Sequence, residues 1–327
     1  MNQTPKTNPG TAGAAQPAQR IGLPDAPLRV GCFVAFTEGP CYSSDGSVYF
    51  TDLLNDRILR FVLTGKFAHE GGWYQVFRSP AGRANGMIFD LEGRLLACEG
   101  SQEGGGRRVT RTEADGRITV LADRYQGKRL NSPNDVDIDA KGRIYFTDPR
   151  YTERDDMELD HESVYRIDTD GTLTRIIDDV VRPNGIQVSI DQKTLYVVDT
   201  NHLEGPPRKV WAYPLNADGS VGPRKLFHDF GTGRGADGLC LDEHGNLYIT
   251  AGLNTASATE DASVPAGVYI FSPDGTQLGL IRLPQDMITN VCFGDADLRT
   301  LYITCGATLF YVRLKVRGHV LWPRAAG

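Results

Sequence analysis

The chain has 327 residues, of which 40% are apolar, 23% charged and 9% aromatic. This composition excludes a disordered tail, a collagen-like fibre and a small disulfide-stapled module. Lys and Arg number 35 against 41 Asp and Glu, which gives a net charge of −6. No excess of cationic side chains is left to neutralise phosphates, so nucleic acid is not expected as a partner.

Residues 1–20 are rich in Thr, Pro, Gly, Ala, Gln and Asn and contain no hydrophobic block. This pattern predicts a flexible leader rather than a signal peptide, followed by a single domain over residues 21–327. No stretch of the sequence approaches the roughly 18 apolar residues of a membrane helix, so no membrane partner is expected. The six cysteines form no CxxC pair. Their even number leaves disulfides open, but their apolar surroundings favour free thiols and a cytoplasmic protein.

A repeat dominates the rest of the chain. After an apolar run at 28–36, six segments share one pattern, in which a polar residue precedes an alternating apolar run, a turn and a second run. They span residues 38–52, 85–99, 134–148, 184–199, 237–250 and 290–304. Successive segments start 47, 49, 50, 53 and 53 residues apart. A steady period of this length is typical of repeat architectures.

Each repeat unit is expected to hold four short strands. Glycines fall eight residues after the start of four segments, where a tight hairpin needs positive φ; they are Gly46, Gly93, Gly142 and Gly245. Further Asp-Gly turns follow, for example at 170–171 and 274–275. The sequence therefore predicts an all-β, six-bladed β-propeller with four-stranded antiparallel blades around a central channel. The run 28–36 would close the ring by completing the blade of residues 290–316.

The first strand of each blade lines the channel of a propeller, so the first residues of the six segments should form one ring. These residues are Glu38, Asn85, Asn134, Asn184, Asp237 and Asn290. A single Asn-Gly or Asp-Gly would indicate only a turn, but six oxygen-bearing side chains in phase favour a site. Buried carboxylates at Glu38 and Asp237 need a cation or hydrogen-bond partners. With Asn134 and Asn184, they make an all-oxygen set suited to Ca²⁺, Mg²⁺ or Mn²⁺ rather than to a thiolate zinc site.

The second strand returns toward the ring, so the loops that follow it should surround the site. These loops are residues 53–57, 100–107, 149–162, 200–209 and 252–266. Expected substrate contacts from these loops and from the entry of the second blade are Arg83, Asn85, Glu103, Arg150, Tyr151 and His202. Packing roles for Arg150 and Tyr151, and a solvated His202, are the alternatives. Arg234 is interpreted as the partner of a carboxylate.

Several segments resemble the senescence marker protein / gluconolactonase / luciferin-regenerating enzyme family of six-bladed propellers. They are TEGPCY, CEG with RRVTRT, NSPNDVDID, FTDPRY, RPNGIQVS and ADGLCLDEHGNLY, which together cover roughly residues 30–315. The resemblance implies that Glu38, Asn184 and Asp237 are metal ligands. It implies that Asn134 binds metal or substrate, and that Asp237 is the general base or nucleophile.

One departure from the family concerns the wall of the pocket. Many bacterial members read CEHG before RRVTRT, whereas this chain reads Cys98-Glu99-Gly100 and then inserts SQEGG. The identity of the substrate is therefore not carried over from the family. The role of the inserted glycine-rich loop, residues 100–106, is left open.

The resemblance and the predicted site together imply a metal-dependent hydrolase that opens a sugar lactone or another small lactone. The cofactor would be one divalent cation, with Ca²⁺ favoured over Mg²⁺, Mn²⁺ or Zn²⁺. Two alternatives remain: a phosphotriester hydrolase that uses the same ion, and a non-catalytic binding propeller with a structural ion. No GxSxG elbow or phosphate-binding glycine loop supports other chemistry. Both a monomer and a dimer are compatible with the sequence.

Overall fold

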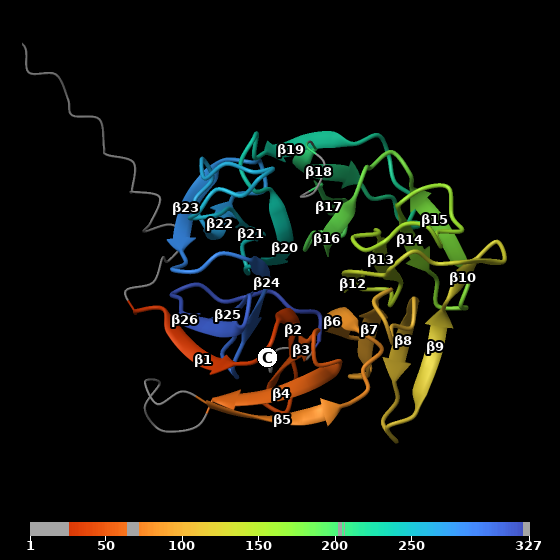
Figure 1. Ribbon diagram of the computed structural model, residues 1–327, viewed down its shortest axis with the longest axis horizontal. Coiled ribbons are helices and arrows are strands. Elements are labelled where there is room, and N and C mark those ends of the chain that lie inside the picture. The colour runs from red at the N-terminus through yellow and green to blue at the C-terminus, as the bar shows by residue number, and fades with distance from the viewer. Residues whose placement is uncertain (1–25, 64–71, 202–204, 206, 323–327) are drawn as a thin grey trace, which may run out of the picture.

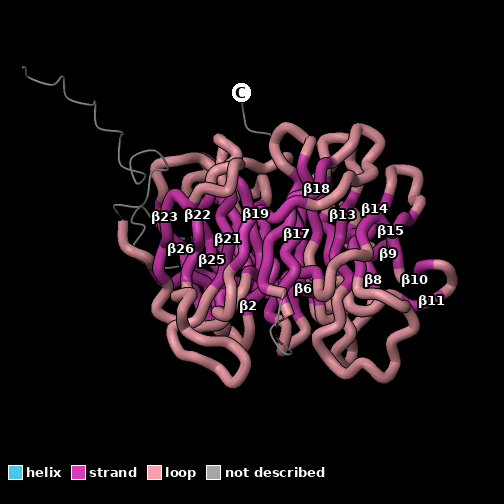
Figure 2. Tube along the Cα trace, turned by 90° about the horizontal axis from the view of Figure 1, so that it is seen from above, coloured by secondary structure: helices cyan, strands magenta, loops and turns pink. Residues whose placement is uncertain are grey.

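A computed structural model describes residues 26–63, 72–201, 205 and 207–322. The predicted leader, residues 1–20, lies outside the described residues. Six four-stranded antiparallel sheets are arranged radially in a ring, which confirms the predicted six-bladed propeller (Figure 1). Seen from the side, the strands form one layer, with loops at both faces (Figure 2). The part of the chain that the structure describes contains no helix, and therefore none that could cross a membrane.

Each blade contains four strands, which follow one another from the channel outward. Blade 1 contains β2 (Thr37–Tyr42), β3 (Val48–Asp52), β4 (Arg57–Leu63) and β5 (Gly72–Arg78). Blade 2 contains β6 (Ala84–Phe89), β7 (Leu95–Glu99), β8 (Arg108–Thr112) and β9 (Ile118–Ala122). Blade 3 contains β12 (Val136–Ile138), β13 (Ile144–Asp148), β14 (Ser163–Ile167) and β15 (Leu173–Ile177).

The other three blades repeat this order. Blade 4 contains β16 (Pro183–Val188), β17 (Thr194–Thr200), β18 (Arg208–Pro214) and β19 (Lys225–Asp229). Blade 5 contains β20 (Ala236–Leu241), β21 (Leu247–Ala251), β22 (Gly267–Phe271) and β23 (Gln277–Arg282). Blade 6 contains β24 (Ile288–Gly294), β25 (Thr300–Cys305), β26 (Thr308–Arg313) and β1 (Arg29–Phe33). A short ribbon of β10 (Arg124–Tyr125) and β11 (Lys128–Arg129) lies between blades 2 and 3 in the chain.

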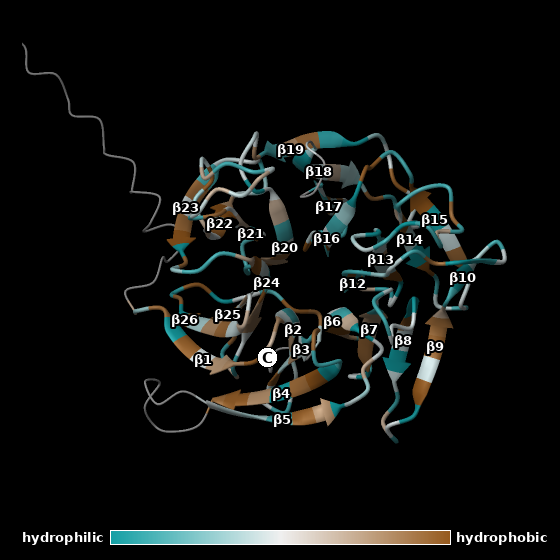
Figure 3. Ribbon diagram, in the orientation of Figure 1, coloured by the Kyte–Doolittle hydropathy of each residue, from teal (hydrophilic) through white to brown (hydrophobic). Residues whose placement is uncertain are grey.

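The predicted hairpin glycines adopt the expected backbone conformation. Gly46, Gly93, Gly142 and Gly245 have φ between 79° and 83°. Residues with a Cβ rarely adopt this conformation, so these four positions fix the turn between the first and second strands. Apolar residues concentrate on the strands, while the connecting loops are mainly hydrophilic (Figure 3).

The hydrophobic core is divided among the spaces between neighbouring blades. Six clusters of buried residues occur, and each joins strands of two adjacent blades. One of them, for example, packs Phe50 and Phe61 of blade 1 against Tyr302 and Tyr311 of blade 6. Stability of the ring therefore depends on contacts between blades as well as on the sheets themselves. All six cysteines are free, as expected from the sequence.

Strand β1 closes the ring, as the run 28–36 predicted. It pairs antiparallel with β26, with Arg29 opposite Tyr311 and Phe33 opposite Thr308. Immediately after it, the Thr37 hydroxyl donates to the carbonyl oxygen of Gly306 at 2.9 Å. The Thr289 hydroxyl donates to the carbonyl oxygen of Thr37, also at 2.9 Å. The N-terminal strand thus joins blade 6 to blade 1.

The segment after β26 crosses the far end of the channel. The Arg317 carbonyl accepts the N–H of Glu243, and the His319 N–H donates to the Leu241 carbonyl in blade 5. Farther on, the Trp322 ring lies 5.1 Å from the Phe89 ring in blade 2. Residues 319–322 line a cavity at this end of the channel. The segment therefore links blades 5 and 2 beneath the axis.

Candidate active site

Five of the six predicted ring residues line one cavity of about 230 Å³. They are Glu38, Asn85, Asn134, Asn184 and Asp237. They come from the starts of β2, β6, β16 and β20 and from the turn before β12. The propeller therefore brings together side chains that are up to about 200 residues apart in sequence. This outcome places the four predicted cation ligands around a common space.

The sixth ring position is occupied by Thr289, and the expectation for Asn290 was wrong. Asn290 takes the position after the ring position, because its N–H donates to Thr304 Oγ1 as the N–H groups of Asp135 and Gly238 donate to Thr147 Oγ1 and Thr250 Oγ1. A shift of one residue exchanges the directions of successive side chains. Thr289 consequently lines the cavity, whereas Asn290 lines the far cavity and hydrogen-bonds to Asp135.

Several ring residues are followed by a glycine because a larger side chain would not fit at that position. A Cβ on Gly86 would lie 2.4 Å from the Asp135 carboxylate, and one on Gly238 would lie 2.1 Å from the Asn290 side chain. A Cβ on Gly185 would lie 2.3 Å from the Asp237 carbonyl oxygen. The Asn-Gly and Asp-Gly pairs therefore mark the close approach of neighbouring blades at the channel, and not turns.

Glu38 and Asp237 are both buried, each with 7% of its surface exposed. Burial raises the pKa of Glu38 well above its usual value, and the charge of Asp237 raises it further. Burial also raises the pKa of Asp237 to about 6, although Arg234 and Asn184 favour its ionised form. The two carboxylates repel each other inside a site that water only partly solvates, so a bound cation would stabilise both.

Asn184 is held by a group of side chains from the neighbouring loop. Its Nδ2 donates to the Tyr151 hydroxyl at 2.9 Å. The Arg182 guanidinium lies over the Tyr151 ring, 5.4 Å from its centre, and donates to Asn201 Oδ1 at 3.0 Å. Tyr151 lines the cavity, which matches its predicted position. These contacts fix both Tyr151 and Asn184 beside Asp237.

Carboxylates at the ends of second strands hold the chain where it enters the ring. Asp52 accepts the N–H groups of Ala35 and Phe36, which lie three and two residues before Glu38. Asp199 in blade 4 accepts the N–H groups of Val181 and Arg182 in the same way, ahead of Asn184. The acidic residues that end these repeats therefore orient the ring residues through the backbone.

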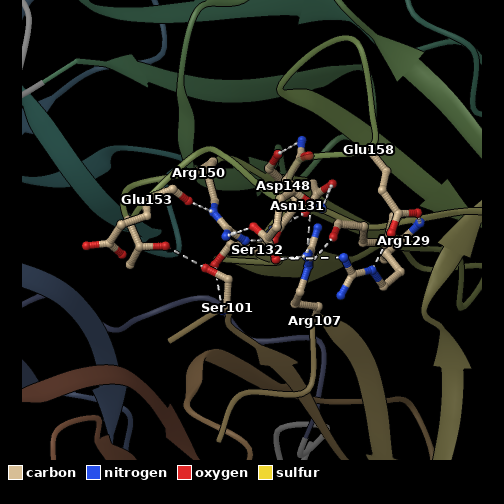
Figure 4. A network of polar contacts seen from close by, with 12 residues as sticks. Ser101, Arg107, Arg129, Asn131, Ser132, Asp148, Arg150, Glu153 and Glu158 are labelled. Atoms are coloured by element: carbon tan, nitrogen blue, oxygen red, sulfur yellow. Dashed lines mark hydrogen bonds and ion pairs between the residues drawn. The ribbon is translucent and has the colours of Figure 1, made fainter. Parts of the chain in front are cut away.

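Three predicted substrate contacts do not line the cavity. Arg150 is buried in a polar network, where it donates to the carbonyl oxygens of Asn131 and Glu153 and pairs with Asp156 (Figure 4). The Arg83 guanidinium donates to the carbonyl oxygens of Leu53, Leu54 and Glu103. Glu103 is exposed. The structure therefore does not support substrate contact at these three positions. The guanidinium groups of Arg150 and Arg83 already donate to backbone carbonyl oxygens. His202 lies outside the described residues.

The inserted loop 100–106 forms one wall of the cavity. Gly100 and Gln102 line it. The Ser101 N–H donates to the Ser132 hydroxyl at 3.0 Å, and the Ser101 and Thr152 hydroxyls are 2.9 Å apart. The Gln102 Oε1 atom is buried and has no hydrogen-bond partner within the described part of the chain. Sequence reasoning did not select Gln102, although the inserted loop itself was noticed.

The donor set fits a hard divalent cation. Two carboxylates and two amides from four blades line one space, and all can offer oxygen. Among the described residues, no group of three or more His, Cys, Asp and Glu side chains is arranged to hold a metal. A cation here would therefore depend on the amide oxygens of Asn134 and Asn184, and on water, to complete its coordination.

Comparisons with known proteins identify the family of the chain. Residues 36–307 match the SMP-30/Gluconolactonase/LRE-like region. A gluconolactonase of Zymomonas mobilis is 30% identical over 312 residues, covering 87% of this chain and 80% of that protein. A 6-deoxy-6-sulfogluconolactonase of Pseudomonas putida is 32% identical over 221 residues, covering 64% and 68%.

A solved structure shows the same architecture. A gluconolactonase from Xanthomonas campestris aligns with a TM-score of 0.75 and 33% identity, covering 91% of this chain and 92% of that one. The sequence match over residues 36–307 shows that this chain belongs to the SMP-30/gluconolactonase/LRE-like family, and the six-bladed propeller is consistent with it.

Proposed function

We propose that the protein is a lactonase that hydrolyses a sugar lactone or another small lactone with the help of one divalent cation, most simply Ca²⁺. The observation that carries the proposal is the pair of buried carboxylates, Glu38 and Asp237, in one cavity with Asn134 and Asn184. Relatives named as gluconolactonases that match most of this chain support the reaction.

Glu38, Asn134, Asn184 and Asp237 would hold the cation. When bound, the cation would supply a Lewis acid that polarises the lactone carbonyl. Asp237 is the proposed proton acceptor, because its buried carboxylate lines the cavity beside the other residues that would hold the cation. It would take a proton from the water whose oxygen bonds to the carbonyl carbon. The ring C–O bond then breaks, and the released alkoxide takes up a proton to give a hydroxy acid.

The remaining wall of the cavity is suited to hydroxyl groups. Asn85, Ser132, Tyr151 and Thr152 offer neutral donors and acceptors. The unpartnered Gln102 Oε1 can accept a hydrogen bond from a substrate hydroxyl. Phe36, Leu53 and Met287 add an apolar portion to the cavity wall. A polyhydroxylated lactone fits this mixture better than a purely aliphatic one.

The test is turnover of glucono-1,5-lactone above its spontaneous hydrolysis, with and without a chelator. We expect activity that chelation removes and added Ca²⁺ restores. Asp237→Asn should lower kcat by about 10²- to 10⁴-fold, because the proton acceptor is lost. Asp218→Asn, the same change at an exposed turn, is the matched control and should leave kcat unchanged.

Two results would contradict the proposal. An Asp237→Asn variant with undiminished kcat would remove Asp237 from the reaction, and activity unaffected by chelation would remove the cation. A phosphotriester assayed in parallel distinguishes the alternative hydrolase, which predicts faster turnover of that substrate than of any lactone.

A further inference from the structure

Arg234 is the only cationic side chain among the described residues that line the active-site cavity. It has 7% of its surface exposed. Its Nη2 atom lies 3.6 Å from Asp237 Oδ2, and its Nη1 atom lies 3.7 Å from Glu260 Oε2. Both distances exceed those of good charge-assisted hydrogen bonds. The Nε atom is buried without a hydrogen-bond partner in the described part of the chain. Arg234 is therefore shared loosely between two carboxylates.

Glu260 is the outer of these two carboxylates. It lies in the loop 252–266 on the rim of the site, and its side chain is 3% exposed. Its other oxygen, Oε1, lies 3.5 Å from Arg208 Nε. Arg208 in turn donates to the Thr259 carbonyl oxygen at 2.8 Å. From the cavity outward, the charges thus alternate in the order Asp237, Arg234, Glu260 and Arg208.

This order has a consequence for a cation bound at Glu38 and Asp237. The cation and Arg234 carry like charges and compete for the same Asp237 carboxylate, so Arg234 opposes cation binding. Glu260 offsets part of that opposition, because it offers Arg234 a second partner away from the cation. Neither residue needs to touch the cation to change its affinity.

We propose that Arg234 and Glu260 form a built-in counter-ion pair that sets the affinity of the site for a divalent cation. Arg234 neutralises Asp237 when the cation is absent and is held by Glu260 when the cation is bound. This inference rests on the proposed function, because it assumes the cation site at Glu38 and Asp237. Arg234 and Glu260 are positioning residues in this scheme.

The experiment measures the dissociation constant for Ca²⁺ by calorimetry on the chelator-treated full chain. Arg234→Met should bind Ca²⁺ about tenfold more tightly, and Glu260→Gln about tenfold more weakly, because a single charge near the site is removed in each. The double variant should return to within a few-fold of the unchanged protein. Arg60→Met, which removes a partly exposed arginine paired with Asp45 in blade 1, is the matched control.

The outcomes separate the two proposals. If the unchanged protein binds none of Ca²⁺, Mg²⁺ and Mn²⁺, the cation site fails and this inference fails with it. If the unchanged protein binds Ca²⁺ and both single variants bind it within twofold of that value, only this inference is overturned. Arg234→Gln, which keeps polar hydrogen atoms at the site, provides the same comparison if Arg234→Met does not fold.

Discussion

Asp148 holds the chain that leads into the active site from blade 3. Its carboxylate accepts the N–H groups of Asn131 at 2.8 Å and Ser132 at 2.7 Å, three and two residues before Asn134. Asp148 is fully buried, and so is Asn131. A buried N–H group that loses its acceptor keeps the full cost of desolvation. The position of Asn134 therefore depends on a carboxylate that does not line the cavity.

Replacement of Asp148 by Ala should lower the free energy of unfolding by about 2–4 kcal/mol, since two N–H groups lose their acceptor. Urea unfolding measures this loss. Asp170→Ala is the control, because Asp170 is exposed in a turn and accepts only local hydrogen bonds. We expect the control to lose less than about 1 kcal/mol. Equal losses in the two variants would show that the burial of Asp148 is irrelevant.

Buried carboxyls also make the stability depend on pH. Burial raises the pKa of Asp137 and of Asp148 to about 7. Between the unfolded value near 4 and pH 7, the folded chain holds protons that the unfolded chain has lost. The contribution of these groups to stability is thus full below pH 4 and is lost as the pH rises to about 7. His228 and His319 act in the opposite direction, because burial lowers their pKa.

Infrared spectroscopy separates the carboxyls from the histidines. In metal-free protein at pH 6, we expect a protonated-carboxyl band that disappears when urea unfolds the chain at the same pH. The part of the band that Asp137 and Asp148 contribute should disappear from the folded protein above pH 8 and be absent from the Asp137→Asn/Asp148→Asn double variant. A folded protein without such a band at pH 6 would contradict the raised pKa values of Asp137 and Asp148.

At the scale of elements, β1 is the strand that closes the propeller. Cys32 is 9% exposed and packs in the cluster between blades 1 and 6, whereas the next residue, Phe33, is 61% exposed. Adjacent residues of one strand therefore face the core and the solvent.

This difference gives a matched pair of variants. Cys32→Asp should cost about 3 kcal/mol or more, because it buries a carboxylate near Asp52 in an apolar cluster. Phe33→Asp introduces the same carboxylate into solvent and should change stability by less than about 0.5 kcal/mol. Thermal unfolding of the two variants makes the comparison. A Cys32→Asp variant as stable as Phe33→Asp would show that β1 does not need to dock for the ring to fold.

The repeat explains why the elements could be predicted. Gly46, Gly93, Gly142 and Gly245 recur in phase because four of the blades use the same hairpin, so the period indicates the fold. Thr289 was missed because Asn290 was aligned with the Asn and Asp residues at the other ring positions. Its N–H donates to Thr304 Oγ1, which makes it equivalent to Asp135 and Gly238, one residue past the ring position. Arg150 was misplaced for another reason. Its partners Asn131 and Asp156 come from separate loops, and loop conformation is not readable from a repeat.

At the scale of the whole molecule, the channel is divided into two cavities that share no lining residue among those the structure describes. Asp135 and Asn290 line the far cavity, directly after the ring positions Asn134 and Thr289, and their side chains join blades 3 and 6 by a hydrogen bond. Gly86 and Gly238 leave room for these two side chains. The active-site cavity is therefore separated from the far half of the channel.

The segment at residues 317–322 completes this separation, because it lies across the opposite end of the channel. The described residues at the open side of the active-site cavity, among them Leu53, Gln102 and Tyr151, belong to the loops at the other face. Under the proposed function, product release and substrate entry would therefore use the same route. Conformational changes of these loops would then affect entry and release, whereas changes in residues 317–322 at the far end would not.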